Sequence, residues 1–265
     1  MGTQCSSKFA VKESILLSLL AGKKDVATLT EETKIIGSTI LHVLKQLEKS
    51  ELTVKTSGVY SLTSLGVIEA QICIWHRLSS NTIKVHKDFW LHHDVTSIPS
   101  TLMMNIGALS ESTLLQATPD SLEKVHTYFI GLLSAAKTIF GVSPIFHPDY
   151  ANVFKELLNQ GVKIQLIATP EVLTRFKQVG ADVLDAHVPT GDLQLFVKDK
   201  VGYAITATDK AYSFGLFSLT GRYDPDADIV GEDEQGRAWV YQLFKHTLTQ
   251  SIPYVYAASS THEEE

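Results

Sequence analysis

The sequence predicts an α+β N-terminal domain, a helical connector and an α/β C-terminal domain, and three observations carry this prediction. Residues 25–63 hold two helical segments followed by two alternating runs around Ser57-Gly58. Residues 79–119 mix apolar and histidine-rich positions without a regular strand pattern. Beyond them, helical apolar spacing alternates with short β-rich runs, which favours helices packed on a buried sheet. We therefore expect domains at residues 1–78 and 120–258.

The third helix of the N-terminal domain has a strongly amphipathic pattern. A first helix is expected over Lys8–Leu20 and a second over Asp25–Thr33, before this one at about residues 36–49. Its apolar residues recur at helical spacing and form one stripe that should face the core. That stripe consists of Ile36, Ile40, Val43, Leu44 and Leu47.

The opposite side of this helix carries hydroxyl, imidazole and ammonium groups and no acid. Ser38, His42, Lys45 and Lys49 recur there at i, i+4, i+7 and i+11, and Thr39 follows Ser38. Phosphates attract such cations, and short polar side chains can read base edges in a major groove. The alternative is a plain helix with a solvated face.

The hairpin that follows completes the pattern. Alternating runs at 52–56 and 59–63 flank Ser57-Gly58, a pair that permits a tight turn, and Lys55 lies near the tip. Helix, break, helix and hairpin in this order are typical of a winged helix-turn-helix. We therefore predict duplex DNA as a partner, bound by Ser38, Thr39, His42, Lys45, Lys49 and Lys55.

Charge is unevenly distributed along the chain, whose net charge is −6. Residues 1–62 hold eight lysines against six acidic residues, so the positive balance of +2 lies in the predicted DNA-binding part. Because this balance is small, we expect a homodimer, which doubles the phosphate contacts. A helix expected over residues 65–78 either pairs with its twin across a dimer axis or packs on its own domain.

The C-terminal domain is expected to alternate helices and strands. The predicted helices cover 121–136, 149–160, 171–178 and 234–250, and the predicted strands cover 138–142, 162–168, 183–187, 193–197, 202–206 and 212–219. Residues 259–265, which end in three glutamates, are expected to be a disordered tail.

The best candidate pocket follows the first strand of this domain. Ser143 and His147 lie in "GVSPIFHPDY", and Thr169 follows the next strand, so the three could meet at the carboxyl edge of a sheet. We predict contacts to a small effector of unknown identity there. The alternative is a hydrolase for a small ester or phosphoester using Ser143, His147 and Asp149, although no GxSxG motif is present. A third interpretation is a rigid structural turn.

Two further clusters favour structural roles over metal binding. Asp224, Asp226 and Asp228 match the start of a calcium loop, but Ile229 and Gln235 stand where glycine and glutamate are required, which indicates a solvated acidic loop. His86, His92, His93 and Asp94 form a loose set for which a surface or domain-interface role is expected.

Several classes of protein receive no support from the sequence. The two cysteines, Cys5 and Cys73, lie far apart and outside any CxxC pair, so neither a disulfide nor a zinc site is expected. No apolar run resembles a signal peptide or a membrane span, and a cytoplasmic protein without membrane contact is expected. We predict no cofactor, no metal and no catalytic residue.

Three motifs in order carry a family resemblance. The stretches "DFWLHHDVTSIPSTLMMNIGAL", "GVSPIFHPDY" and "GLFSLTGRYDPDADIVGEDEQGRAWVYQLF" resemble archaeal winged-helix regulators of the methanogenesis-regulatory type. The resemblance spans nearly the whole chain. It implies a transcription regulator of one-carbon or methanogenesis genes in a methanogenic archaeon.

The C-terminal domain also looks distantly like a phospholipase D-type fold. If Asp199 matches the aspartate of that enzyme motif, Asp192 and Gln194 stand in place of its histidine and lysine. The nucleophilic imidazole and the phosphate-binding ammonium are then missing. The sequence as a whole therefore predicts a dimeric, ligand-responsive DNA-binding regulator. A scaffold whose winged helix binds protein is the remaining alternative.

Overall fold

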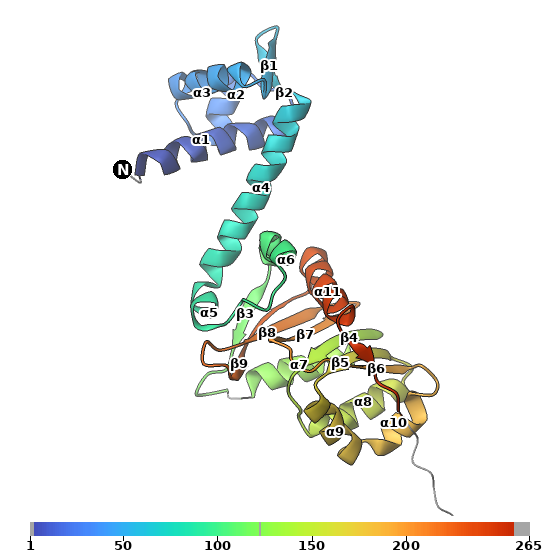
Figure 1. The fold of residues 1–265 in the computed structure, drawn as a ribbon. Coiled ribbons are helices and arrows are strands. Elements are labelled where there is room, and N and C mark those ends of the chain that lie inside the picture. The colour runs from blue at the N-terminus through green and yellow to red at the C-terminus, as the bar shows by residue number, and fades with distance from the viewer. Residues whose placement is uncertain (1–2, 122, 257–265) are drawn as a thin grey trace, which may run out of the picture. The chain divides into compact units, whose positions relative to one another are not determined.

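The computed structural model describes residues 3–121 and 123–256 and divides the chain into two compact units, residues 1–80 and 81–265. The division falls inside one long helix, and Figure 1 shows the elements of each unit. Unit 1 contains α1 (Thr3–Leu20), α2 (Val26–Thr33), α3 (Gly37–Lys49), β1 (Thr53–Thr56), β2 (Val59–Leu62) and most of α4 (Ser64–Val85).

Unit 1 has its own apolar core. Buried side chains from α1, α2, α3, α4 and the β1–β2 hairpin pack together, including Leu16, Leu29, Leu44 and Tyr60. The helix α4 begins against this core, and the Thr63 hydroxyl accepts the Gly66 N–H to cap it. A Cβ on Gly66 would lie 1.9 Å from the Leu52 carbonyl oxygen, so this close approach requires glycine.

Unit 2 is a mixed sheet covered by helices. Its helices are α5 (Lys87–His92), α6 (Ser100–Met104), η1 (Ile106–Leu109), α7 (Lys124–Ser134), α8 (Asp149–Asn159), α9 (Pro170–Val179), α10 (Ala181–His187) and α11 (Glu234–Leu248). Its strands are β3 (Thr113–Gln116), β4 (Thr138–Ser143), β5 (Lys163–Ala168), β6 (Leu193–Val197), β7 (Tyr203–Thr208), β8 (Tyr212–Phe217), β9 (Tyr223–Gly231) and β10 (Ile252–Pro253).

The eight strands form one sheet in the order β10-β6-β5-β4-β7-β8-β9-β3. The strands β4, β5 and β6 are parallel, whereas β7, β8, β9 and β3 continue the sheet in antiparallel pairs. One apolar cluster joins α7–α10 to the parallel strands, and a second joins α11, α6 and η1 to the other face (Figure 1). Successive side chains of a strand point to opposite faces of the sheet, so each face has its own set of apolar side chains.

The structure corrects the expected connector at 79–119. Phe89, Ile98, Ile106 and Leu109 are buried in the second cluster of unit 2, and the unpredicted strand β3 pairs with β9 at the edge of the sheet. Residues 81–119 therefore belong to unit 2, residues 79–80 belong to unit 1, and no separate connecting segment remains. The apolar content of this stretch is too high for a linker because these apolar side chains are buried in the core of unit 2.

Two other expected elements are wrong. Residues 183–187, predicted as a strand, lie in the helix α10, because the adjacent Val183 and Leu184 both pack into the cluster around α8 and α9. The expected acidic loop after Arg222 is the nine-residue strand β9, which places Ala227 and Ile229 in the core of one face. The expected disordered tail at 259–265 lies outside the described residues.

Among the described residues, no helix is both long enough and apolar enough to cross a membrane. The remaining predicted helices and strands are present, and their ends shift by up to seven residues, the most at α4, which continues to Val85.

Candidate functional site

The first candidate site is the exposed side of α3. Ile40, Val43, Leu44 and Leu47 are buried in the core of unit 1. Ser38, His42, Lys45 and Lys49 are exposed on the other side, and Thr39 is half-buried. The geometry therefore offers one hydroxyl, one imidazole and two ammonium groups to solvent from a single helix face.

Ile36 does not join the apolar stripe that the sequence predicts. It is 71% exposed, because α3 begins at Gly37 and Ile36 is the extended residue before it. The preceding helix α2 is capped by Asp25, whose carboxylate accepts the Thr28 N–H at 2.8 Å and has its pKa lowered by this bond. It ends at Lys34 in the left-handed conformation (φ 58°), which turns the chain sharply into α3.

The hairpin after α3 has the predicted two-residue turn. Ser57 (φ 50°) and Gly58 (φ 90°) both take positive φ, and Thr56 pairs with Val59 across the turn. Lys55 is exposed, and its ammonium lies 5.2 Å from the centre of the Tyr60 ring, a cation–π contact that steadies the side chain. Lys24 exchanges two backbone hydrogen bonds with Tyr60, which adds a third chain segment to the hairpin.

The second candidate site is a cavity of about 400 Å³ in unit 2, between α7, α8, α9 and one face of the sheet. Its walls are mainly apolar and include Phe129, Phe146 and Phe176. Small side chains on the strands, Gly141 and Ala204, leave the space that larger residues would fill. A cavity of this size is typical of small-molecule sites.

A buried carboxyl group borders the cavity. Asp228 is 6% exposed, and its Oδ2 accepts the hydroxyl of Ser213, another lining residue, at 2.5 Å. Burial and the nearby Asp224 raise the pKa of Asp228 to about 6, while the hydrogen bond from Ser213 opposes the rise. Burial and the nearby Asp228 in turn raise the pKa of Tyr223. The cavity thus has a polar group able to donate or accept a proton in an apolar wall.

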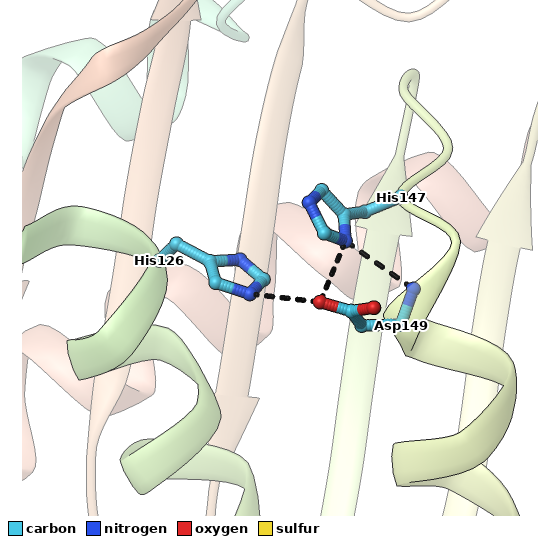
Figure 2. A group of neighbouring side chains, drawn as sticks. All are labelled: His126, His147 and Asp149. Carbon is cyan, nitrogen blue, oxygen red and sulfur yellow. Dashed lines mark hydrogen bonds and ion pairs between the residues drawn. The ribbon is translucent and has the colours of Figure 1, made fainter. Parts of the chain in front are cut away.

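Three titratable side chains also line the cavity. Figure 2 shows that they point toward one another. His126 comes from α7, His147 from the loop after β4, and Asp149 is the first residue of α8. Oδ2 of Asp149 lies 3.6 Å from Nε2 of His126 and 3.5 Å from Nδ1 of His147. Their side chains are 31%, 43% and 62% exposed for His126, His147 and Asp149 respectively. His126 lies in no sequence motif and was not predicted as a site residue. Only the packing of α7 on α8 brings it close to the other two side chains.

Of the residues predicted for ligand contact, the structure places Ser143 and His147 at the cavity. Thr169 is not a lining residue, and its Oγ1 accepts the Val172 N–H at 3.4 Å to cap α9. Its place after β5 was right, but its hydroxyl is used by the helix that follows. Ser143 Oγ donates to the Ile145 carbonyl oxygen at 2.6 Å, so its proton is directed into its own turn and away from an imidazole base. This geometry disfavours the hydrolase alternative.

Two other groups of residues have structural partners of their own. They are the histidines near residue 90, and the residues that stand in place of the phospholipase D-type histidine and lysine. His86 and His93 are buried in unit 2, where His86 contacts Ser112 and His93 contacts both Phe89 O and Asp224. This corrects the expected surface or interface role for His86 and His93, whereas His92 is exposed as expected. Both buried rings bond buried polar groups, although Nδ1 of His86 has no hydrogen-bond partner among the described residues. At the enzyme-like positions, Asp192 pairs with Lys163 and Gln194 accepts from Gln165 at 3.0 Å, and neither residue lines the cavity.

Comparisons with known proteins match both units. Residues 5–75 match the family model for the N-terminal domain of methanogenesis regulatory protein FilR1, and residues 122–250 match the model for its middle domain. The FilR1 protein of Methanothrix harundinacea (strain 6Ac) is 25% identical over 254 residues. That alignment covers 91% of this chain and 55% of the relative, so the chain spans about half the length of the curated relative it matches.

Solved structures give weaker overlaps. The archaeal chromatin protein TrmBL2 is 17% identical, with a TM-score of 0.45, covering 92% of this chain and 94% of that one. Phosphatidylserine synthase of Haemophilus influenzae Rd KW20 is 14% identical, with a TM-score of 0.40, covering 77% and 61%. Both scores are below 0.5, so neither overlap establishes a shared fold. The two matched domains, in order and covering most of the chain, show that it belongs to the FilR1 family of methanogenesis regulatory proteins.

Proposed function

We propose that the chain is a DNA-binding transcriptional regulator that uses unit 1 as a winged helix-turn-helix. The observation that carries the proposal is the exposed side of α3, where Ser38, His42, Lys45 and Lys49 face solvent together. Ammonium groups neutralise phosphates, and hydroxyl and imidazole groups can bond base edges. Lys55 on the hairpin adds a cation for the backbone beside the groove.

We also propose that two copies pair through α4. Leu65, Ile68, Ile72 and Trp75 are between 42% and 58% exposed, and their spacing of three, four and three residues places them on one side of the helix. Four large apolar side chains in one stripe are costly to leave in water and suit a helix–helix contact. A second copy would double the phosphate contacts available to a unit whose own charge is small.

The cavity of unit 2 is proposed as the effector site. Its apolar walls suit an apolar small molecule, and Asp228 with Ser213 offers one polar anchor. Ser143 and His147 stand among the lining residues. An effector controls DNA binding only if its affinity differs between two arrangements of the dimer, and the coupling then runs in both directions. In keeping with the family, we propose that the target genes serve one-carbon metabolism or methanogenesis and that the protein acts in the cytoplasm without being an enzyme.

A gel-shift titration of the full chain against the DNA upstream of its own gene tests the DNA assignment. The double variant Lys45→Ala/Lys49→Ala should weaken binding by about tenfold or more, because two phosphate contacts are lost. Lys200→Ala removes an exposed lysine from unit 2 and is the matched control, which should bind as the wild type does. Equal affinity in the double variant would contradict the assignment, and binding to protein without any DNA complex would favour the scaffold alternative.

A further inference from the structure

We propose that His126, His147 and Asp149 form a binding site for a divalent transition-metal ion of the zinc class, at the cavity of unit 2. Two imidazole nitrogens and a carboxylate oxygen, one from each residue, all lie within 4.8 Å of one another. In Figure 2 the three side chains converge from α7, the loop after β4 and the start of α8. Imidazole and carboxylate groups are common ligands of such ions.

The distances fit the proposed ion closely. Ligand atoms at about 2.0–2.1 Å from a tetrahedral zinc ion lie roughly 3.3 Å from one another. The carboxylate oxygen of Asp149 lies 3.6 Å from Nε2 of His126 and 3.5 Å from Nδ1 of His147. Both of these distances are within a few tenths of an ångström of that value, and all the candidate ligand atoms lie within 4.8 Å of one another.

The Nδ1 lone pair of His147 is held only by a weak contact at the start of α8. Its Nδ1 accepts the backbone N–H of Asp149 at 3.3 Å, which is long for a hydrogen bond. An acceptor nitrogen is the deprotonated one, and this is the form that binds a metal ion. An ion would take over the lone pair from a weak hydrogen bond, and the amide N–H at the start of α8 could turn to solvent.

The segments that carry the ligands are held by packing. Between β4 and α8, Pro148 restricts the backbone beside His147, and the next residue but one, Tyr150, stacks on Phe154. On α7, the buried Val125 fixes the turn that carries His126. The two imidazole rings lie 4.3 Å apart between centroids. The ligand positions are thus set before an ion arrives, which lowers the ordering cost of binding.

Three protein ligands leave coordination positions free. Closed structural zinc sites use four protein ligands, whereas sites with three keep a position for water or a bound molecule. All three residues line the cavity, so that position can be reached by a molecule held there. A cavity occupant with a donor atom would then bind ion and protein together. This last step rests on the proposed effector role of the cavity, whereas the metal site itself does not.

The competing account needs no ion. A protonated imidazole beside Asp149 would give the same distances as a plain ion pair. The two accounts differ in one measurable respect, because the ion pair binds no metal and the proposed site binds one equivalent per chain.

Isothermal titration calorimetry with Zn²⁺ on the chelator-treated, tag-free full chain tests the proposal. We expect one tight site, weakened at least tenfold in both His126→Ala and Asp149→Asn, since even loss of a supporting group costs about that much. His246→Ala, an exposed histidine on α11, is the matched control and should leave the site intact. Cobalt(II) added to the wild type should give the visible absorption of a low-coordinate site.

Circular dichroism of the metal-free variants separates loss of ligand from loss of fold, and Asp149→Asn preserves shape at an exposed position. Absence of a one-equivalent site in the wild type would overturn the proposal. So would wild-type zinc affinity in both folded variants, which would indicate binding by other surface histidines. Because zinc binding is measured without DNA, failure of the proposed DNA function would leave the result unaffected.

Discussion

Replacing the carboxyl group of Asp228 by an amide tests the electrostatics of the cavity wall. Burial raises the pKa of Asp228 from 3.8 to about 6. A rise of roughly two units corresponds to about 3 kcal/mol, since each unit is worth about 1.4 kcal/mol. The native chain holds this proton more tightly than the unfolded chain does. Stability must therefore fall as the pH rises through this window, and the loss is complete above the folded pKa.

The expected size follows from the two pKa values. Between about pH 4.5 and pH 8, titration of Asp228 should remove about 2 kcal/mol from the free energy of unfolding of unit 2. Asp228→Asn does not titrate and retains an oxygen that can accept the Ser213 hydroxyl. The variant should lose this part of the pH dependence. Between pH 4.5 and pH 8 its free energy of unfolding should therefore fall by about 2 kcal/mol less than that of the wild type.

Urea unfolding followed by tryptophan fluorescence measures this difference, because Trp239 is buried in unit 2. Asp226→Asn changes an exposed carboxylate on the same strand and is the matched control, which should keep the wild-type pH profile. The contradicting result is an equal loss of stability in Asp228→Asn and the wild type between the two pH values. Ionisation of the buried carboxyl group would then carry no measurable free-energy cost, and the reasoning on its burial would be refuted.

Three other changes have definite expected outcomes. Gly215→Ala should lower the free energy of unfolding by about 1–3 kcal/mol in thermal melting, because its Cβ would lie 2.2 Å from the buried Oδ1 of Asp228. Gly131→Ala is the control: a Cβ there would have nothing within 4 Å, so the change should be neutral or stabilising. Ile72→Glu should convert the proposed dimer to monomers in sedimentation experiments while Gln71→Glu, beside it on α4, should not; equal masses would argue against the α4 contact. Ala204→Leu narrows the cavity and should weaken binding of an apolar fluorescent dye about tenfold, and unchanged dye affinity would place the dye elsewhere.

Much of unit 1 could be predicted because local rules decide it. The stripe of α3 has one apolar and one polar side, and each side chain takes its position from helical spacing alone. The turn at Ser57-Gly58 follows from two residues that tolerate positive φ. The prediction was wrong for Ile36, because this residue lies just before α3 begins. Helical spacing does not determine the direction of a side chain outside the helix.

Unit 2 was harder because its acidic strand contradicts local preference. Asp224, Asp226 and Asp228 are typical of loops, yet in β9 they alternate with Ala227 and Ile229, which pack into the core. Burial of Asp228 on the other face depends on its bond to Ser213 on the preceding strand β8, and on the register that places the two residues together. No local rule predicts such a pairing.

The cavity shows the same limit. His147 and Ser143 were found because they follow a strand, where pockets in α/β folds are common. His126 was missed because it lies on a helix with no motif, and only packing of α7 on α8 brings it to Asp149. Thr169 was overestimated because a residue after a strand can also cap the next helix, and the capping role prevailed.

The salt dependence of DNA binding by Lys45→Ala tests the central claim most directly. Fluorescence anisotropy gives the slope of log affinity against log salt concentration for the wild type and the variant. If the exposed side of α3 contacts the DNA backbone through Lys45, the slope should fall by about one unit, and binding should weaken to a similar degree on all sequences. An unchanged slope and affinity would show that DNA does not approach this face of α3.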